Sequence, residues 1–196
     1  MGNYIYDIAL QAFKTFAIMF DSITVNPHIN LTLFQPFDKE NLMRYLNDPE
    51  IYQNTSRIPY PYTEKDADEW LNLVEDNRQR LGAPTNWAIR HRNAGLIGGI
   101  GRFAKSGLEG HFDEIGYWLA APYRGQGLMS EVVSSFSDWL FANSALKRIE
   151  AWVFPFNVAS IRVLEKSGYD REGYARKRVN KNGTLYDAVL LAKIKA

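Results

Sequence analysis

Cysteine is missing from this sequence altogether. Its absence excludes disulfide bonds, a thiol nucleophile and any thiolate metal site. A surplus of one charge is missing too, because 23 lysines and arginines stand against 22 aspartates and glutamates, for a formal net charge of +1. Proteins that bind nucleic acid usually carry a basic excess or a basic stripe, so we expect no nucleic-acid partner.

Long apolar runs are also absent, since no stretch reaches the roughly 18 consecutive apolar residues of a transmembrane helix. The most apolar segment, residues 8–20, is broken by Gln11 and Lys14. It has neither the basic start nor the cleavage site of a signal peptide, so we expect a cytoplasmic protein. Its apolar residues recur at helical spacing and predict a helical N-terminal extension at residues 1–29, with a membrane-surface helix as the alternative.

What is present is ample material for a core, because 46% of the residues are hydrophobic and 14% aromatic. A length of 196 residues predicts a single domain, which we place at residues 30–196. Antiparallel hairpins followed by a strand–helix–strand unit predict an α+β (mixed αβ) fold. The periodicity predicts strands at 30–36, 85–91, 96–103, 112–121 and 148–154, helices at 39–47, 63–80, from 127 and at 158–166, and a hairpin at 176–194.

Several short signals refine this order. Asp38 is the expected N-cap of the first helix, and Thr63 with Asp66 opens the second. Two prolines forbid a helix in residues 56–62, a stiff aromatic segment that could wall a substrate cleft or simply pack on the surface. Asn182–Gly183 is the expected turn of the last hairpin.

The most informative segment is EIGYWLAAPYRGQGLMSE, residues 114–131. A strand runs into a turn with Gly125 and Gly127, and the turn runs directly into an amphipathic helix. Free N–H groups at a helix start, approached closely through glycines, suit a phosphate ligand. Leu128 rules out a P-loop and Ser130 a dinucleotide fingerprint. The alternative is a tight turn without a ligand.

Two motifs together carry a resemblance. The run Arg124-Gly-Gln-Gly127-Leu-Met129 resembles the Gln/Arg-x-x-Gly-x-Gly/Ala signature of the GCN5-related N-acetyltransferase (GNAT) superfamily. Further along, the run from Asn157 to Tyr169 resembles the Asn-x-x-Ser…Glu-Lys-x-Gly-Phe block of the branch that contains the ribosomal-protein N-terminal alanine and serine acetyltransferases. The resemblance extends from about residue 30 to the C-terminus. It implies a GNAT fold with about six or seven strands, mostly antiparallel, and a V-shaped splay at the CoA site.

The resemblance also implies roles for individual residues. Ser160 would lie near the thioester sulfur, although it could be a plain first-turn hydroxyl. Asn157 would contact the pantetheine arm or the acceptor, with a helix N-cap as the alternative. Met129 replaces a small residue of the family, so a local adjustment is expected there. The CoA pyrophosphate would be held by backbone groups of Arg124, Gly125, Gln126, Gly127, Leu128 and Met129, and the pantetheine arm by Trp118, Leu119 and Ala120.

An amine acceptor must lose a proton, and Glu114 is the best base candidate. It matches the position of the catalytic glutamate in the histone-acetylating branch. Alternatively, Glu114 is a structural carboxylate, either at a sheet edge or in a salt bridge. In that case a chain of water molecules would serve as the base. Residues 176–179 lack the glutamate that the ribosomal enzymes use. The histidines show no metal-ligand spacing, so no metal is expected.

The sequence therefore predicts an N-acetyltransferase with acetyl-CoA as co-substrate and a primary amine as acceptor. A protein or peptide N-terminus is the first candidate for that amine. The alternatives are a small-molecule or antibiotic amine, or a non-catalytic acyl-CoA-binding sensor. A homodimer stays open.

Overall fold

The structure, a computed structural model, describes residues 22–105 and 109–196. Residues 1–21 of the predicted helical extension lie outside this part of the chain, and the prediction is wrong for residues 22–29, where β1 and the start of β2 stand in place of a helix. The elements, in chain order, are β1 (Ser22–Asn26), β2 (Ile29–Thr32), η1 (Pro36–Asp38), α2 (Lys39–Leu46), α3 (Pro49–Asn54), α4 (Glu64–Leu81), β3 (Asn86–His91), β4 (Gly95–Arg102), β5 (Phe112–Leu119), η3 (Ala121–Tyr123), α5 (Leu128–Asn143), β6 (Arg148–Val153), α6 (Val158–Lys166), β7 (Asp170–Lys181) and β8 (Thr184–Ile194).

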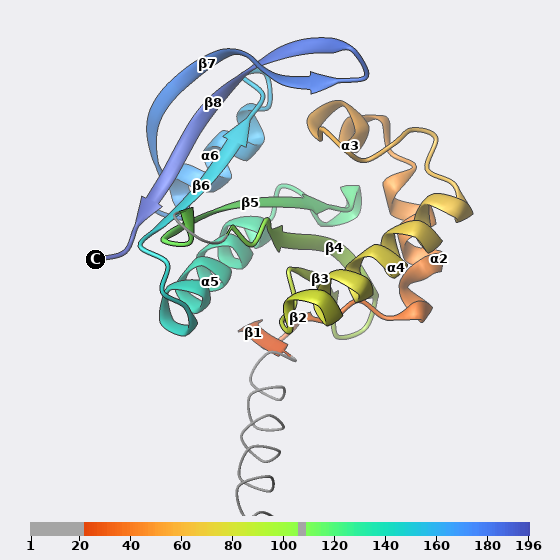
Figure 1. The fold of residues 1–196 in the computed structure, drawn as a ribbon. Coiled ribbons are helices and arrows are strands. Elements are labelled where there is room, and N and C mark those ends of the chain that lie inside the picture. Colours follow the sequence, from red (N-terminus) through yellow and green to blue (C-terminus); the bar gives the residue numbers. More distant parts are fainter. Residues whose placement is uncertain (1–21, 106–108) are drawn as a thin grey trace, which may run out of the picture.

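One mixed sheet of eight strands organises the molecule, in the order β1-β2-β3-β4-β5-β6-β8-β7 (Figure 1). All neighbours are antiparallel except β5 and β6. This arrangement confirms the predicted mixed αβ class. The sheet has one strand more than expected because residues 22–26 form β1 at its edge, so the sheet begins before residue 30.

The sheet splays at its centre. Strands β5 and β6 pair only through their first three residues, Phe112–Glu114 with Arg148–Glu150. Beyond that point β5 continues along β4 as far as Leu119, whereas β6 leaves toward β8. Figure 1 shows the two strands diverging, as the predicted V-shaped splay requires. One side of β5 is therefore left without a strand partner over residues 115–119.

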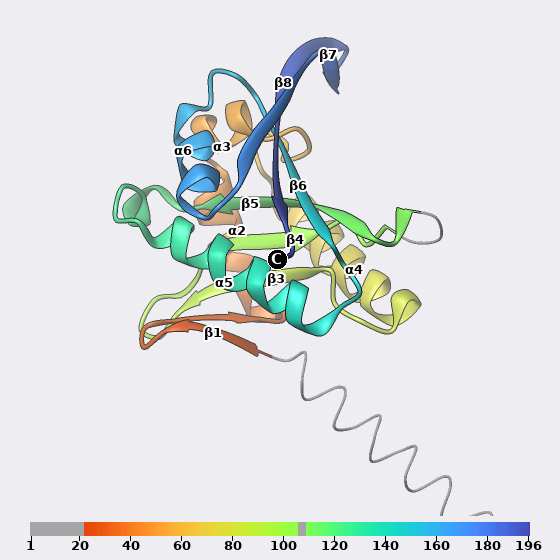
Figure 2. The ribbon, with the colours of Figure 1, turned by 90° about the vertical axis from the view of Figure 1, so that its left-hand side faces the viewer.

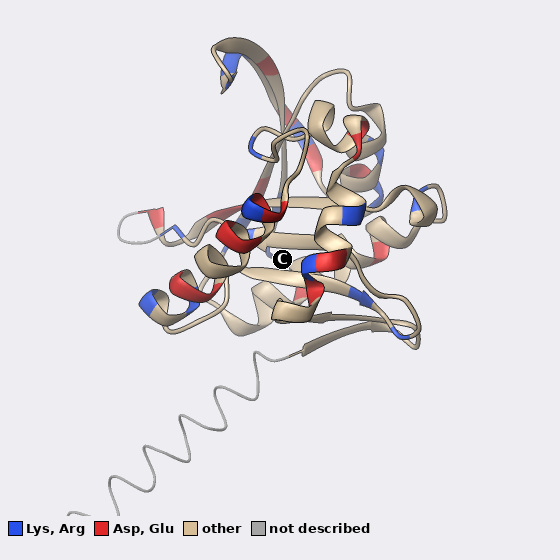
Figure 3. Cartoon of the chain, turned by 90° about the vertical axis from the view of Figure 1, so that its right-hand side faces the viewer, with Lys and Arg blue, Asp and Glu red and all other residues tan. Residues whose placement is uncertain are grey.

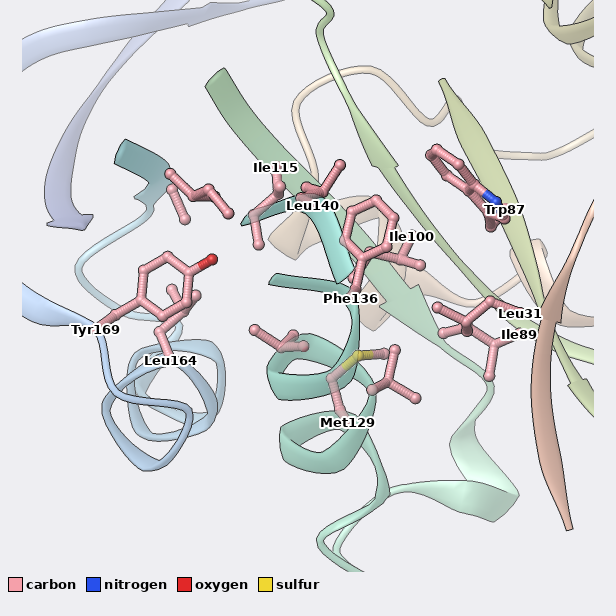
Figure 4. Close-up of a cluster of buried hydrophobic side chains, with 14 of the residues drawn as sticks. Leu31, Trp87, Ile89, Ile100, Ile115, Met129, Phe136, Leu140, Leu164 and Tyr169 are labelled. Atoms are coloured by element: carbon pink, nitrogen blue, oxygen red, sulfur yellow. The ribbon is translucent and has the colours of Figure 1, made fainter. Parts of the chain in front are cut away.

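Helices cover both faces of the sheet (Figure 2). On one face, α5 and α6 pack over a large cluster that includes Phe136, Leu164 and Trp87, whose ring lies 4.9 Å from that of Phe136 (Figure 4). On the other face, α2, α3 and α4 bury a second cluster that includes Leu42 and Ile51. Two independent cores thus fix β5 from both sides, which makes it a rigid base for a site.

The helix starts that the sequence predicts mostly agree with the structure. Thr63 and Asp66 form the capping box that starts α4, as expected. Asp38 does occupy the N-cap of α2, but its side chain makes no capping bond and instead holds Arg90 through two hydrogen bonds of 2.8 Å. Helix α3 was missed, although Pro49 at its first position and a capping Asp48 are ordinary start signals.

Charges of both signs are spread over the helices, while the central strands carry few (Figure 3). Within residues 22–105 and 109–196, no helix is long and apolar enough to cross a membrane.

Candidate active site

A cavity of about 510 Å³ opens where β5 and β6 diverge. Its walls are the unpaired side of β5, strand β6, the turn before α5, helix α6, and helix α3 with the residues after it. Of the predicted site residues, all except Ala120 and Gln126 line this one cavity. The structure therefore brings together residues that the sequence separates by more than forty positions.

The turn at residues 124–129, called here the phosphate turn, has the geometry of an anion site. Gly125 and Gly127 adopt φ angles of 77° and 80°, in the left-handed region that favours glycine. Ser130 and Glu131 donate the first backbone hydrogen bonds within α5, both to the Gly127 carbonyl. The N–H groups before them have no acceptor inside the helix and lie at the positive end of its dipole. This arrangement suits a phosphate group.

Two side chains of the phosphate turn are held by the protein itself. Met129 belongs to the first core cluster with Phe136 and is buried, although it also lines the cavity (Figure 4). The Gln126 side chain folds back and donates to the Pro122 carbonyl at 3.1 Å. The groups of this turn that could bind an anion are therefore its main-chain N–H groups.

The Arg124 side chain connects the phosphate turn to the opposite wall. Its Nη2 donates to Asp48 Oδ2 at 2.7 Å and its Nη1 to Glu50 Oε2 at 2.7 Å. Its Nε donates to the Leu119 carbonyl at 2.9 Å. Asp48 is also the N-cap of α3, through a bond from the Glu50 N–H. Arg124 therefore ties α3 to the turn, a role that the sequence did not indicate.

The unpaired side of β5 offers main-chain hydrogen bonds in the cavity. The Ala120 N–H donates to the Ile97 carbonyl of β4 at 2.9 Å, and the Glu114 carbonyl accepts from Phe103. Because alternate residues of a strand bond to opposite neighbours, even-numbered positions face β4 and odd-numbered positions face the cavity. Of the three residues expected at the pantetheine arm, Leu119 is thus the one whose main chain faces the cavity, together with Tyr117.

Glu114 lies at the vertex of the splay, opposite Glu150 in the last residue pair of β5 and β6. Burial raises the pKa of its carboxyl group, Lys105, Arg178 and Arg57 act in the opposite direction, and Glu150 adds to the rise. The sheet-edge alternative is wrong, because β5 lies between β4 and β6. In the described part of the chain, no ion pair involves Glu114. A half-buried carboxylate of this kind is suited to accept a proton.

Ser160 faces Glu114's strand from α6 and has a partner that the sequence did not reveal. Its Oγ lies 2.8 Å from the Tyr117 Oη, across the cavity wall. Burial raises the pKa of Tyr117, so this phenol stays protonated at neutral pH. The Asn157 Oδ1 accepts from the Ser160 N–H at 3.0 Å, which confirms Asn157 as the N-cap of α6; its contact with a ligand stays a prediction.

Two cations of α6 line the cavity as well. Arg162 and Lys166 are one helical turn apart and flank the side near the phosphate turn. Lys166 is exposed to solvent at the end of α6 and also lines the cavity. Among the described residues, no group of three or more histidine or acidic side chains could hold a metal ion.

Beyond Val179 and Asn54, which line the cavity, the tip of the β7–β8 hairpin reaches α3 (Figure 1). Lys181 Nζ donates to the Tyr52 carbonyl and lies 3.7 Å from the centroid of the Tyr52 ring. Asn182 Nδ2 donates to the Tyr52 hydroxyl at 3.3 Å. The aromatic segment 56–62, in contrast, contributes only Ser56 to the cavity wall, and its Tyr62 is buried in the second core.

Comparisons with known proteins agree with this geometry. YjcK of Bacillus subtilis, named a probable N-acetyltransferase, is 43% identical over 99 residues, which are 50% of this chain and 54% of YjcK. The chain therefore matches about half the length of that relative.

Among solved structures, an acetyltransferase of the GNAT family from Bacillus anthracis is 26% identical, with a TM-score of 0.75 over 88% of this chain and 98% of that one. RimL, a ribosomal L7/L12 α-N-protein acetyltransferase in complex with coenzyme A, shares the fold at 20% identity, with a TM-score of 0.78 over 89% of this chain and 98% of its own.

The family model of the acetyltransferase (GNAT) domain matches residues 28–170, a segment that contains the splay, the phosphate turn, Glu114 and Ser160. Fold, cavity and comparisons thus lead to one conclusion: the chain belongs to the GNAT family and is an N-acetyltransferase.

Proposed function

We propose that this enzyme transfers the acetyl group of acetyl-CoA to a primary amine, with a protein or peptide N-terminus as the first candidate acceptor. The observation that carries the proposal is the content of the single cavity between β5 and β6. A phosphate turn lies at one side, a half-buried carboxylate at another, and unpaired main chain runs between them.

The donor fits the side formed by the phosphate turn. N–H groups at the start of α5 would hold the pyrophosphate, with Arg162 and Lys166 adding positive charge. The pantetheine arm would extend β5 through the main chain of Tyr117 and the N–H of Leu119, as an added strand does, since the Leu119 carbonyl accepts from Arg124. A cavity-facing N–H of β5 would polarise the thioester carbonyl.

The chemistry then needs protons to leave the amine and one to reach the sulfur. Glu114 accepts a proton from the ammonium group, and the freed amine attacks the thioester carbonyl carbon. The new C–N bond replaces the C–S bond, the nitrogen loses its second proton to solvent, and the departing sulfur takes the proton of the Ser160 hydroxyl. The Tyr117 Oη lies 2.8 Å from Ser160 Oγ, and this step uses Tyr117 as the donor, which leaves the serine proton for the sulfur. Solvent returns a proton to Ser160 and removes one from Glu114, which leaves an amide and CoA.

A screen of peptide N-termini and small amines, read by release of the CoA thiol, tests the proposal. We expect release with at least one peptide and a marked loss in Glu114→Gln. A preference for small amines over every peptide would favour the small-molecule alternative. Binding of acetyl-CoA without thiol release for any amine would overturn the proposal.

A further inference from the structure

Three basic side chains lie within electrostatic reach of Glu114, two of them on rings that line the cavity, and we call them the basic rim. Arg57 follows α3, Lys105 follows β4, and Arg178 lies on β7. The charge of each acts on the Glu114 carboxyl group. Within residues 22–105 and 109–196, no member of the rim forms an ion pair with an acidic group. The rim therefore carries positive charge that the described part of the protein does not neutralise by direct contact.

Aromatic rings position all three cations. Arg57 lies 4.8 Å from the ring centroid of Phe103, and Arg178 lies 4.8 Å from that of Trp152. Both rings line the cavity. The Lys105 ammonium lies 4.0 Å from the ring centroid of Phe112. The face of an aromatic ring attracts a cation without accepting a hydrogen bond from it. The N–H donors of the Arg and Lys side chains therefore stay available to another group.

A bulge in β7 presents Arg178. Residues 176–178 stand opposite the single residue Asp187 of β8, and Lys177 adopts a φ angle of 54°. The Asp187 carboxylate accepts from the Lys177 N–H at 2.8 Å and from the Tyr174 hydroxyl at 2.7 Å. Bulges re-aim side chains near active sites, and a left-handed non-glycine residue persists only where its surroundings hold it. The contacts of Asp187 thus stabilise the bulge, and the bulge places Arg178 beside the cavity.

This arrangement constrains the acceptor. An ammonium group that approached alone would meet three positive charges and only one unpaired carboxylate, so the rim would repel it. An acceptor with its own anionic group would be attracted to the rim while its amino group reached Glu114. A guanidinium group binds a carboxylate through two parallel hydrogen bonds, which makes Arg178 the natural anchor.

We propose that the acceptor is an amine that carries a carboxylate close to its amino group, with the carboxylate bound by the basic rim and the amine facing Glu114. This inference rests on the proposed transfer from acetyl-CoA and names the substrate class of the same site. Two sources share this chemistry: a free amino acid, through its α-carboxylate, and a peptide with Asp or Glu next to its N-terminus.

The test uses matched acceptors and the full chain at saturating acetyl-CoA. One arm compares amino acids with their amides, and the other compares peptides that differ by Asp or Asn at the second position. We expect the carboxylate member of at least one arm to have a kcat/KM at least about tenfold higher, the size expected for one charge-assisted hydrogen bond. The arm with the larger ratio identifies the source.

Variants assign the preference to the rim. In Arg178→Gln the ratio should fall toward one, and in Arg178→Glu it should invert. Arg176→Gln is the matched control, because it removes the same charge from the same bulge at a residue whose charge acts on Asp187. It should keep the wild-type ratio. The acetyl-CoA-induced thermal shift verifies that each variant is folded.

Equal kcat/KM within both arms, or a preference that survives in Arg178→Gln, would overturn this inference and leave the transfer reaction standing. No thiol release with any member of either arm, or with any neutral amine, would overturn the transfer reaction and this inference with it.

Discussion

The two sides of the cavity are built in different ways. The main-chain phosphate site of the donor side is a run of neighbours in the chain, the phosphate turn with the first turn of α5. The acceptor side is assembled from α3, the residues after β4 and the bulge of β7, which are far apart in the sequence. A site made of consecutive residues leaves a local pattern, whereas a site made by convergence does not. The phosphate turn was therefore predictable from its local pattern and Glu114 from the family resemblance, whereas the cations of the basic rim were not.

The largest effect is expected on the donor side, from Gly127→Glu. Acetyl-CoA at 100 times its dissociation constant should stabilise the wild type by about 2.7 kcal/mol, and the added bulk and negative charge should abolish this gain. Differential scanning fluorimetry with and without acetyl-CoA measures it. Gly82→Glu is the control, because Gly82 also has a left-handed φ, 68°, and open space around it. A ligand-induced shift that survives in Gly127→Glu would show that the turn does not hold the phosphates.

Ser160 lies between the two sides, and its substitution should separate binding from chemistry. Ser160→Ala removes the proton donor for the thiolate, so kcat should fall by about 10²-fold or more. The affinity for acetyl-CoA should change little, because the Ser160 N–H still donates to Asn157 Oδ1, the N-cap of α6. Tyr117→Phe should act in the same direction with a smaller loss. Wild-type turnover in Ser160→Ala would reduce Ser160 to a helix-start hydroxyl.

Glu114→Gln probes the acceptor side through pH. Because a base works only when ionised, wild-type kcat/KM should rise as pH increases through the raised pKa of Glu114. The variant should lose a factor on the order of 10² at neutral pH and less at high pH, where the amine is already neutral. A pH–rate profile of both proteins with one amine checks this. Parallel profiles of equal height would leave a water chain as the base.

The same substitution has an expected sign for stability. A carboxyl group whose pKa is raised in the folded state binds its proton more tightly there, so folding stability falls as pH rises from the ordinary pKa through the raised one. Lys105, Arg178 and Arg57 moderate the effect and Glu150 adds to it. Glu114→Gln should therefore not lower the melting temperature at neutral pH. A clear loss of stability would point to a structural role.

The smallest effect is expected from Arg124→Gln, which tests the link between the two sides. Side chains of Arg124 and Asp48 are 28% and 20% exposed, so their ion pair should contribute about 1 kcal/mol or less. The backbone of the phosphate turn keeps its shape, so acetyl-CoA affinity should stay near wild type while the acceptor KM rises a few-fold. Titration calorimetry and initial-rate kinetics separate the two. A loss confined to acetyl-CoA binding would assign the side chain to the donor.

Sequence patterns predicted what is local and periodic. The capping box of Thr63, the glycines of the phosphate turn and the turn at Asn182–Gly183 all act within a few residues, and the structure has them where the patterns indicated. Strand β1 was missed because it is a short edge strand, and α3 because six residues hold too little periodicity.

Contacts between residues far apart in the chain have no comparable local pattern in the sequence. Tyr117 and Ser160 are 43 positions apart, and Arg124 and Asp48 are 76 apart. Only the splay of β5 from β6 brings the first pair together, and only the packing of α3 brings the second. Each rim cation taken alone looks like an ordinary surface residue. The position of Arg178 depends on the bulge in β7, and no residue type in that segment predicts a bulge.

The contact of the β7–β8 hairpin with α3 bears on the shape of the acceptor. Lys181 and Asn182 contact Tyr52 of α3, and the nearby residues Val179 and Asn54 line the cavity, so the hairpin and α3 are joined beside one end of it. A polypeptide end can enter beside such a junction, whereas a segment that continues in both directions would have to separate the hairpin from α3 first. We therefore expect the enzyme to distinguish α-amino groups from lysine side chains in the middle of a folded polypeptide by topology alone.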